Sequence, residues 1–571
     1  MRKKKKTSLP LILGAAVLLI AGGAVAYWFL VQRKNLGDAL VGANVIPQDA
    51  LLAVSISTAP EQWQQLRQYG TPETQAEFSK QLASLTNNFL TANGYNYQQD
   101  IQPWLGKQVT IAYLPSKAAA ATAKPIQPTP PLAQQSMVMV LPIDDALKAQ
   151  QLLEKPNSPS SGKFVQRNYK GIQIRQTQGS SSQNLSTTLL GRFLVVTSDS
   201  FAIERAIDTY KGGASLAATP GYKSALAQIQ AYQPFAQLYL NVPGWAANLA
   251  ATSARELSPE KLAQAQQKQG IAATVTLEQE GIRFKGISWL KPNSPNKLVV
   301  ENNAKIMPSR LPADTLLMMS NGNLQHLWQD YVRGAASNPL TPIKPENLRA
   351  GFKSTTGLDL EQDLLSWMGG EFSLSLIPKP KSAASDLGVG VALAVQATSR
   401  SSAQTTFNQL DEVMAKKYQF QVQKTQLGGQ PVVNWTSQLG GIIATHGWLD
   451  QNVAFLTLGA PVAEALVPKP KATLAENELF IQAVPKDLSP NNGHFFIDVE
   501  NTINAGNLAL PPIAPQQKKL ISAMRAIGVT AAIHNDSSTR FDIFVMLKKA
   551  GQPSPASNPT GSASGSPSPK R

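Results

Sequence analysis

The sequence contains one ordered set of motifs twice, so its fold must accommodate two copies of a single unit. Each copy opens on a short Pro/Asp/Leu segment and carries a Trp-Leu-Gly or Trp-Met-Gly block further along. The matched positions, in chain order, are residues 46–52 with 311–317, Trp63 with Trp328, Trp104 with Trp367, and Arg283-Phe284 with Arg540-Phe541. Matches in one order, with slowly changing spacing, indicate a duplicated unit.

The length and the motif limits predict how the chain is divided. At 571 residues it exceeds the size that one hydrophobic core usually supports. The Ser/Pro/Gly tail is predicted to be disordered because it has no apolar run to bury. The predicted segments are 1–34 (basic start and anchor), 35–44 (stem), 45–291 (copy one), 292–305 (linker), 306–549 (copy two) and 550–571 (tail).

The N-terminus predicts a membrane anchor. Five basic residues lie at positions 2–6, and an uncharged apolar run follows at residues 9–31. A helix of that length spans about 34 Å, enough to cross a hydrocarbon core of about 30 Å. The positive-inside rule then places the N-terminus in the cytoplasm and the rest of the chain in the periplasm or lumen. A cleaved signal peptide, ending near Ala24-Val25-Ala26, is the competing interpretation.

Within each copy, strand and helix patterns alternate and most neighbouring strands are joined by tight turns. Residues 51–57 read as a buried strand, and residues 60–69 and 73–90 have helical spacing. Val109, Ile111 and Tyr113 alternate with small or polar residues, as in a half-buried strand. Many hairpins and few crossovers favour antiparallel sheets covered by helices. The predicted fold class is α+β, with an N-terminal transmembrane helix followed by two tandem duplicated domains.

Composition argues against several function classes. Cysteine is absent, which excludes disulfides, thiolate metal sites and cysteine nucleophiles. The net charge is +16, but seven of the basic residues fall within positions 1–34, where no acid occurs. Since the rest of the chain shows no basic stripe interleaved with aromatic residues, we expect no nucleic-acid partner.

No residue pattern specifies a reaction, so no catalytic, cofactor-binding or metal site is predicted and the protein is not expected to be an enzyme. The four histidines, His326, His446, His494 and His534, lack ligand spacing and read as surface or turn residues. Asp144-Asp145 reads as a helix cap, and Asp49 and Asp314 read as turn or cap residues.

Tryptophan offers the remaining candidates for binding. The matched pairs Trp63/Trp328 and Trp104/Trp367 could stack on a flat ligand, but core packing in two similar units is the favoured interpretation. Trp245, Trp435 and Trp448 have no match in the other copy and are better candidates for a surface contact.

The basic start, the single apolar run and the two doubled motifs together resemble a cyanobacterial family of membrane-anchored proteins, domain of unknown function 3352. That resemblance implies a plasma-membrane or thylakoid location and supplies no catalytic residues. The sequence therefore leaves two expected functions. The first is a non-enzymatic structural, scaffold or interaction protein with protein or cell-wall partners. The alternative is a carrier that holds a lipid, pigment or other apolar ligand between helices and sheet.

Overall fold

A computed structural model describes most of the chain. The described residues are 40–89, 96–115, 135–154, 163–178, 185–252, 267–295, 297–335, 344–380, 388–504 and 515–549.

The first half contributes ten strands: β1 (Leu52–Ser57), β2 (Gln108–Leu114), β3 (Ser136–Pro142), β4 (Lys163–Tyr169), β5 (Ile172–Gln178), β6 (Ser186–Leu190), β7 (Phe193–Thr197), β8 (Ala236–Leu240), β9 (Lys268–Glu278) and β10 (Gly281–Leu290). The second half contributes β11 (Leu317–Asn321), β12 (Phe372–Pro378), β13 (Val389–Gln396), β14 (Gln421–Leu427), β15 (Gln430–Thr436), β16 (Ile442–Trp448), β17 (Val453–Gly459), β18 (Gly493–Asp498), β19 (Met524–Asn535) and β20 (Ser538–Leu547).

The α-helices of the first half are α2 (Pro60–Leu66), α3 (Pro72–Phe89), α4 (Ala146–Glu154), α5 (Ser200–Tyr210), α6 (Tyr222–Ala227) and α7 (Val242–Thr252). Those of the second half are α9 (Leu324–Ala335), α10 (Pro345–Thr356), α11 (Arg400–Lys416), α12 (Ala463–Leu466), α13 (Glu478–Ala483), α14 (Val499–Asn504) and α15 (Pro515–Ser522).

All twenty strands belong to one antiparallel sheet whose order repeats about its centre. From one edge to the middle the order is β4-β5-β6-β7-β3-β2-β1-β8-β9-β10. From the middle to the other edge it is β20-β19-β18-β11-β12-β13-β17-β16-β15-β14. Each strand of the first half therefore has a counterpart, ten strands later in the numbering, at the mirrored place.

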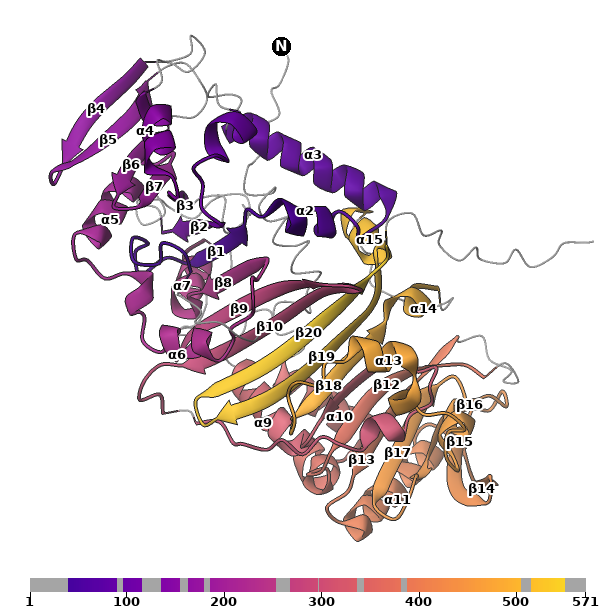
Figure 1. Cartoon of the computed structure of the whole chain (residues 1–571). Helices are drawn as coiled ribbons and strands as arrows, with labels where there is room; N and C mark the ends of the chain where they lie inside the picture. The colour runs from indigo at the N-terminus through magenta and orange to yellow at the C-terminus, as the bar shows by residue number, and fades with distance from the viewer. Residues whose placement is uncertain are drawn as a thin grey trace, which may run out of the picture.

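The two halves meet where β10 pairs with β20, along the register from Gly281↔Met546 to Trp289↔Ser538. Figure 1 shows these two strands side by side in the middle of the molecule. The prediction of two tandem domains, each with its own sheet, is therefore wrong. The final strand of each half would be an open edge by itself, and pairing the two edges satisfies their backbone hydrogen bonds.

Each face of the sheet is covered by its own set of segments. On the face that carries Ala53 and Met318, α5 and α6 cover the first half and α12 and α13 cover the second. The opposite face, which carries Val54 and is called face A below, is packed at the centre by side chains from α2, α14 and α15. This central core draws on both halves of the chain, so neither half buries its apolar surface alone.

The membrane-anchor prediction is corrected by this structure. Within the described ranges, no helix combines the length and the apolar character needed to cross a membrane. The transmembrane part of the predicted fold class, the single-pass signal anchor and the membrane location built on it are therefore not supported. The predicted span, residues 9–31, lies outside the described residues, as does the predicted disordered tail.

Several local predictions are confirmed. The strand expected at residues 51–57 is β1, and the helices expected at 60–69 and 73–90 are α2 and α3. Asp145 accepts a hydrogen bond from the backbone N–H of Lys148 at 3.1 Å, as a cap should. Asp49 and Asp314 both lie in turns.

Candidate functional site

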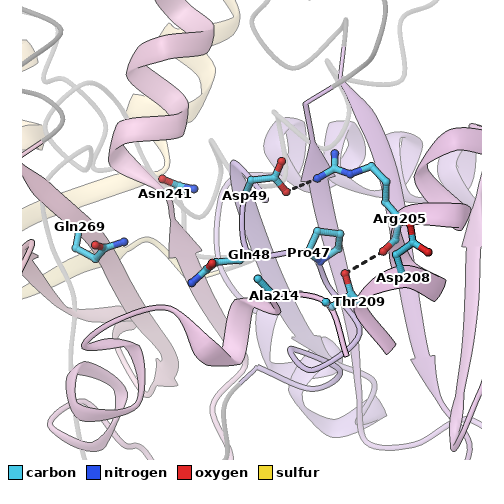
Figure 2. A pocket seen from close by; sticks show the side chains of 10 residues that line it. Pro47, Gln48, Asp49, Arg205, Asp208, Thr209, Ala214, Asn241 and Gln269 are labelled. Carbon is cyan, nitrogen blue, oxygen red and sulfur yellow. Dashed lines mark hydrogen bonds and ion pairs between the residues drawn. The ribbon is translucent and has the colours of Figure 1, made fainter. Parts of the chain in front are cut away.

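A cavity of about 490 Å³ opens beside the first turn of copy one. Figure 2 shows the amide side chains of Gln48, Asn241 and Gln269 on one side and α5 on the other. The α5 wall carries Arg205 and Asp208. These residues were not identified from the sequence, because α5 reads only as an amphipathic helix with an Asp199 cap.

The charged groups of this cavity are engaged with each other or with neighbours. Arg205 donates to the carboxylate of Asp49 and also to the carbonyl oxygen of Pro115. Asp208 forms an ion pair with Lys170, with 2.6 Å between Nζ and Oδ1. The cavity thus offers amide and hydroxyl groups for hydrogen bonding. It is not the apolar space between helices and sheet that a lipid or pigment carrier requires.

The surroundings of this cavity are only partly repeated in the second half. Asn241 and its counterpart Asp498 keep a shared role, since each accepts a backbone hydrogen bond at the start of the next helix. The wall differs, because α5 extends over eleven residues and its counterpart α12 over only four. The long helix wall of this cavity is therefore a feature of copy one.

His446 is buried and His494 is half-buried within a strand, which contradicts their assignment to surface or turn positions. His446 is stacked on Phe407 with ring centroids 4.5 Å apart, and its Nε2 lies 2.9 Å from Asp411. Trp435 donates to the same carboxylate oxygen at 2.7 Å. Asp411 belongs to α11, so this cluster fixes the helix against β15 and β16.

His494 lies on β18 with Nδ1 3.1 Å from the hydroxyl of Thr530. Burial lowers the pKa of His494 to about 4, so the ring is neutral at pH 7. The other two histidines are different: His326 contacts Glu301 at 2.8 Å, and partial burial lowers the pKa of His534. Among the described residues, no three His, Asp or Glu side chains are arranged to hold a metal ion.

The matched tryptophans divide into two kinds. Trp104 and Trp367 are fully buried, and their indole N–H groups donate to the carbonyl of Asp100 and the hydroxyl of Thr406. Their assignment to the core is confirmed. Trp63 and Trp328 are half-buried. Trp63 packs against the edge of the central core, and Trp328 packs against the edge of the core beneath α11.

The unmatched tryptophans give mixed results. Trp435 is buried beneath α11, which removes it as a candidate for a surface contact. Trp448 is half-buried and Arg400 lies over its ring, with the guanidinium carbon 3.9 Å from the centroid. Trp245 is also half-buried.

We call the pairing of β10 with β20 the seam between the halves. It contains a buried ionic cluster. Arg283 donates from Nε and Nη2 to the two carboxylate oxygens of Asp542, at 3.0 and 2.7 Å, and its Nη2 lies 2.9 Å from Asp487. The Asp542 side chain is only 2% exposed. Burial raises the pKa of Asp542 to about 6, although Arg283 and Lys285 favour its charged form.

Lys285 lies directly opposite Asp542 in the β10–β20 register. The repeat that aligns Arg283-Phe284 with Arg540-Phe541 also aligns Lys285 with Asp542, so the axis relating the halves passes through this pair. Identical strands would place two like charges here, which repel each other across a ladder. The substitution of one member by an opposite charge makes the pairing of unlike halves favourable.

Face A of the second half carries a group of large apolar side chains that are exposed or half-buried. We call this group the apolar strip; its members are Leu317 and Met319 on β11, Leu374 and Leu376 on β12, Val391 on β13 and Leu458 on β17. Met319 is opposite Leu374, Leu317 is opposite Leu376, and Val391 lies between Leu376 and Leu458. Four of them are 37–45% exposed, namely Met319, Leu374, Val391 and Leu458.

The corresponding positions in copy one are mostly buried, and Ile111, in the place of Leu374, is half-buried. Leu52, Val54, Tyr113 and Met137 occupy the places of Leu317, Met319, Leu376 and Val391, and each is at most 9% exposed. Ser198, which follows β7 and corresponds to Leu458, is exposed and polar. Copy two therefore shows larger apolar exposure at matched positions. The strip is the described feature that best fits a binding surface.

Comparison with known proteins identifies the family without a function. No curated protein matches the chain. Two crystal forms of TP0453, forms III and I, are similar at 10% and 12% identity, with a TM-score of 0.24 for each. These matches cover 45% and 47% of this chain and 83% and 80% of TP0453. The family model described as "Protein of unknown function (DUF3352)" matches residues 11–547, and the chain therefore belongs to this family.

Proposed function

We propose that this chain is a non-enzymatic interaction protein that uses the apolar strip of its second half to bind another protein. The proposal rests on the way in which polar and apolar residues are divided between the two faces of β12. Its two serines, Ser373 and Ser375, lie on the covered face, whereas Leu374 and Leu376 lie on the uncovered one. A sheet with one solvated face normally has the opposite arrangement.

The neighbouring strand β13 supports the same interpretation. Its covered positions hold the small residues Ala392 and Ala394, and its uncovered position holds Val391. Exposed apolar patches on folded proteins commonly mark protein-binding surfaces. A protein that covers the strip would bury the large side chains that the chain itself leaves open.

A photoactivatable amino acid at position 319 tests this proposal in the full chain under native conditions. We expect one discrete cross-linked species that disappears when Leu374→Glu is also present. The matched control is Gln423→Glu, a charge added at an exposed position of β14, which should leave the species unchanged. Cross-linking that is absent, or that is indifferent to Leu374→Glu, would contradict the proposal.

A further inference from the structure

We infer that the occupant of the apolar strip is a single amphipathic helix supplied by a partner protein. This inference rests on the proposed function and names the structural class of the partner. It depends on what covers the rest of face A, on the size of the strip and on its composition.

Helices already cover face A on both sides of the strip. On one side α9 and α11 pack on Phe372, Val395 and Ala454, and the same core reaches Leu393 and Leu456. On the other side α14, α15 and α2 pack against the central strands. The strip is thus continuous with an existing interface between sheet and helices. A helix would complete that layer.

The strip is small. It crosses β11, β12, β13 and β17, which are three strand spacings, or about 14 Å, and its two rows lie about 7 Å apart along the strands. A helix with side chains is about 10–12 Å wide, and 14 Å of helix contains about ten residues. The strip therefore matches the apolar face of a helix of about three turns.

The same dimensions argue against a second copy of this chain as the occupant. A stable protein dimer buries about 800 Å² on each partner. A footprint of roughly 14 by 10 Å supplies a small fraction of that area. A single helix that lies between α11 and α14 can instead also contact the sides of those helices, as helices of one layer do.

The composition of the strip fits an apolar rather than a charged ligand surface. All six members are Leu, Met or Val, and Met supplies the adaptable packing that is common in helix-binding grooves. The partner helix should therefore present apolar residues at positions i, i+3, i+4 and i+7 and polar residues elsewhere.

The test uses a fluorescent 14-residue peptide of Leu and Lys with leucines at i, i+3, i+4, i+7 and i+11, titrated with the full chain. Fluorescence anisotropy should show saturable binding that weakens at least about tenfold in the Leu374→Glu/Leu458→Glu variant. The control variant Gln423→Glu/Gln426→Glu adds the same charge on exposed β14 positions and should bind as the unchanged protein does. A peptide of the same composition without an apolar face should bind at least about tenfold more weakly.

Thermal unfolding shows whether the double Glu variant is folded, and Leu374→Thr/Leu458→Ser replaces it if it is not. Equal binding of both peptides, or equal binding by strip and control variants, overturns the inference. So does strip-dependent binding to phosphatidylcholine vesicles without peptide binding. Strip-dependent dimerisation in sedimentation velocity would overturn it as well.

The two proposals fail in different ways. A cross-linked species from position 319 that depends on Leu374, together with no peptide binding, leaves the proposed function intact and removes the helix. If the cross-linked species is absent, the proposed function itself fails.

Discussion

The two halves of the sheet share one strand order but differ in how far the side chains of face A are exposed. In copy one, Val54 is 3% exposed, whereas its counterpart Met319 is 37% exposed. The backbone frame is repeated while the covering is not, so duplication has kept the sheet and let the surface diverge. The second half has the exposed apolar side chains, which is why we assign the interaction surface to that half.

The largest loss of stability is expected from a substitution in the seam, where the two halves pair. The substitution Asp542→Lys places a third positive charge beside Lys285 and Arg283 in a buried cluster. Because a buried charge without a partner is costly, we expect a loss of about 3–5 kcal/mol in the free energy of unfolding. Urea denaturation of the full chain measures it.

The reversed pair, Lys285→Asp with Asp542→Lys, is the control for that prediction. It restores opposite charges across the β10–β20 register and should recover part of the lost stability. A double variant as unstable as the sum of the two single variants would show that the pair does not act as a unit.

Truncation of one leucine in each half sharpens the comparison of face A between the two halves. Leu52→Ala removes a buried side chain and should cost about 2–5 kcal/mol. Leu374→Ala, on the uncovered strip, should cost less than about 1 kcal/mol. Chemical denaturation compares the two, and equal costs would mean that the strip is covered in solution.

A histidine that is found in the second half alone at its matched position should make stability depend on pH. His494 occupies the place of Gln237 in copy one, and its pKa is lowered to about 4 by burial. The unfolded chain binds a proton near pH 6.5, so stability should fall as pH drops from about 6.5 to 4. One pKa unit corresponds to about 1.4 kcal/mol, and the total is on the order of 3 kcal/mol.

His494→Gln introduces the residue of copy one. The fall in stability between about pH 6.5 and 4 should become smaller in this variant. Calorimetric unfolding from pH 4 to 7 measures it, and an unchanged slope would refute the assignment. The rise in the pKa of Asp542 to about 6 acts oppositely, since it favours the folded state at low pH and that contribution is lost as pH rises through 6. Asp542→Asn separates the two effects.

The smallest expected effect is that of Leu458→Ser, which introduces the residue of copy one at an exposed strip position. Stability should change by no more than about 0.5 kcal/mol, because the side chain is 45% exposed. Binding of the Leu/Lys peptide should nevertheless weaken. A large loss of stability would indicate that Leu458 packs within the fold.

Much of the local structure follows from sequence, because repeat motifs and periodicity are local signals. The β1 strand, the Asp199 cap of α5 and the burial of Trp104 and Trp367 could all be predicted in this way. The pairing of β10 with β20 could not be, since an apolar strand has the same pattern at an edge and inside a sheet. For that reason two domains were expected where the chain forms one sheet.

The candidate surface was hidden by the same ambiguity. Residues 372–378 read FSLSLIP, which predicts a half-buried strand with its leucines inward. The structure buries Ser373 and Ser375 and leaves Leu374 39% exposed. Alternation identifies two faces but not the one that neighbouring segments cover, and that depends on long-range contacts.

Thiol labelling tests the difference between the two halves of face A most directly, because the chain contains no native cysteine. Single Val54→Cys and Met319→Cys variants of the full chain would be exposed to a maleimide reagent under native conditions. We predict labelling at position 319 at least about tenfold faster than at position 54. Equal rates at the two matched positions would contradict an open strip on the second half.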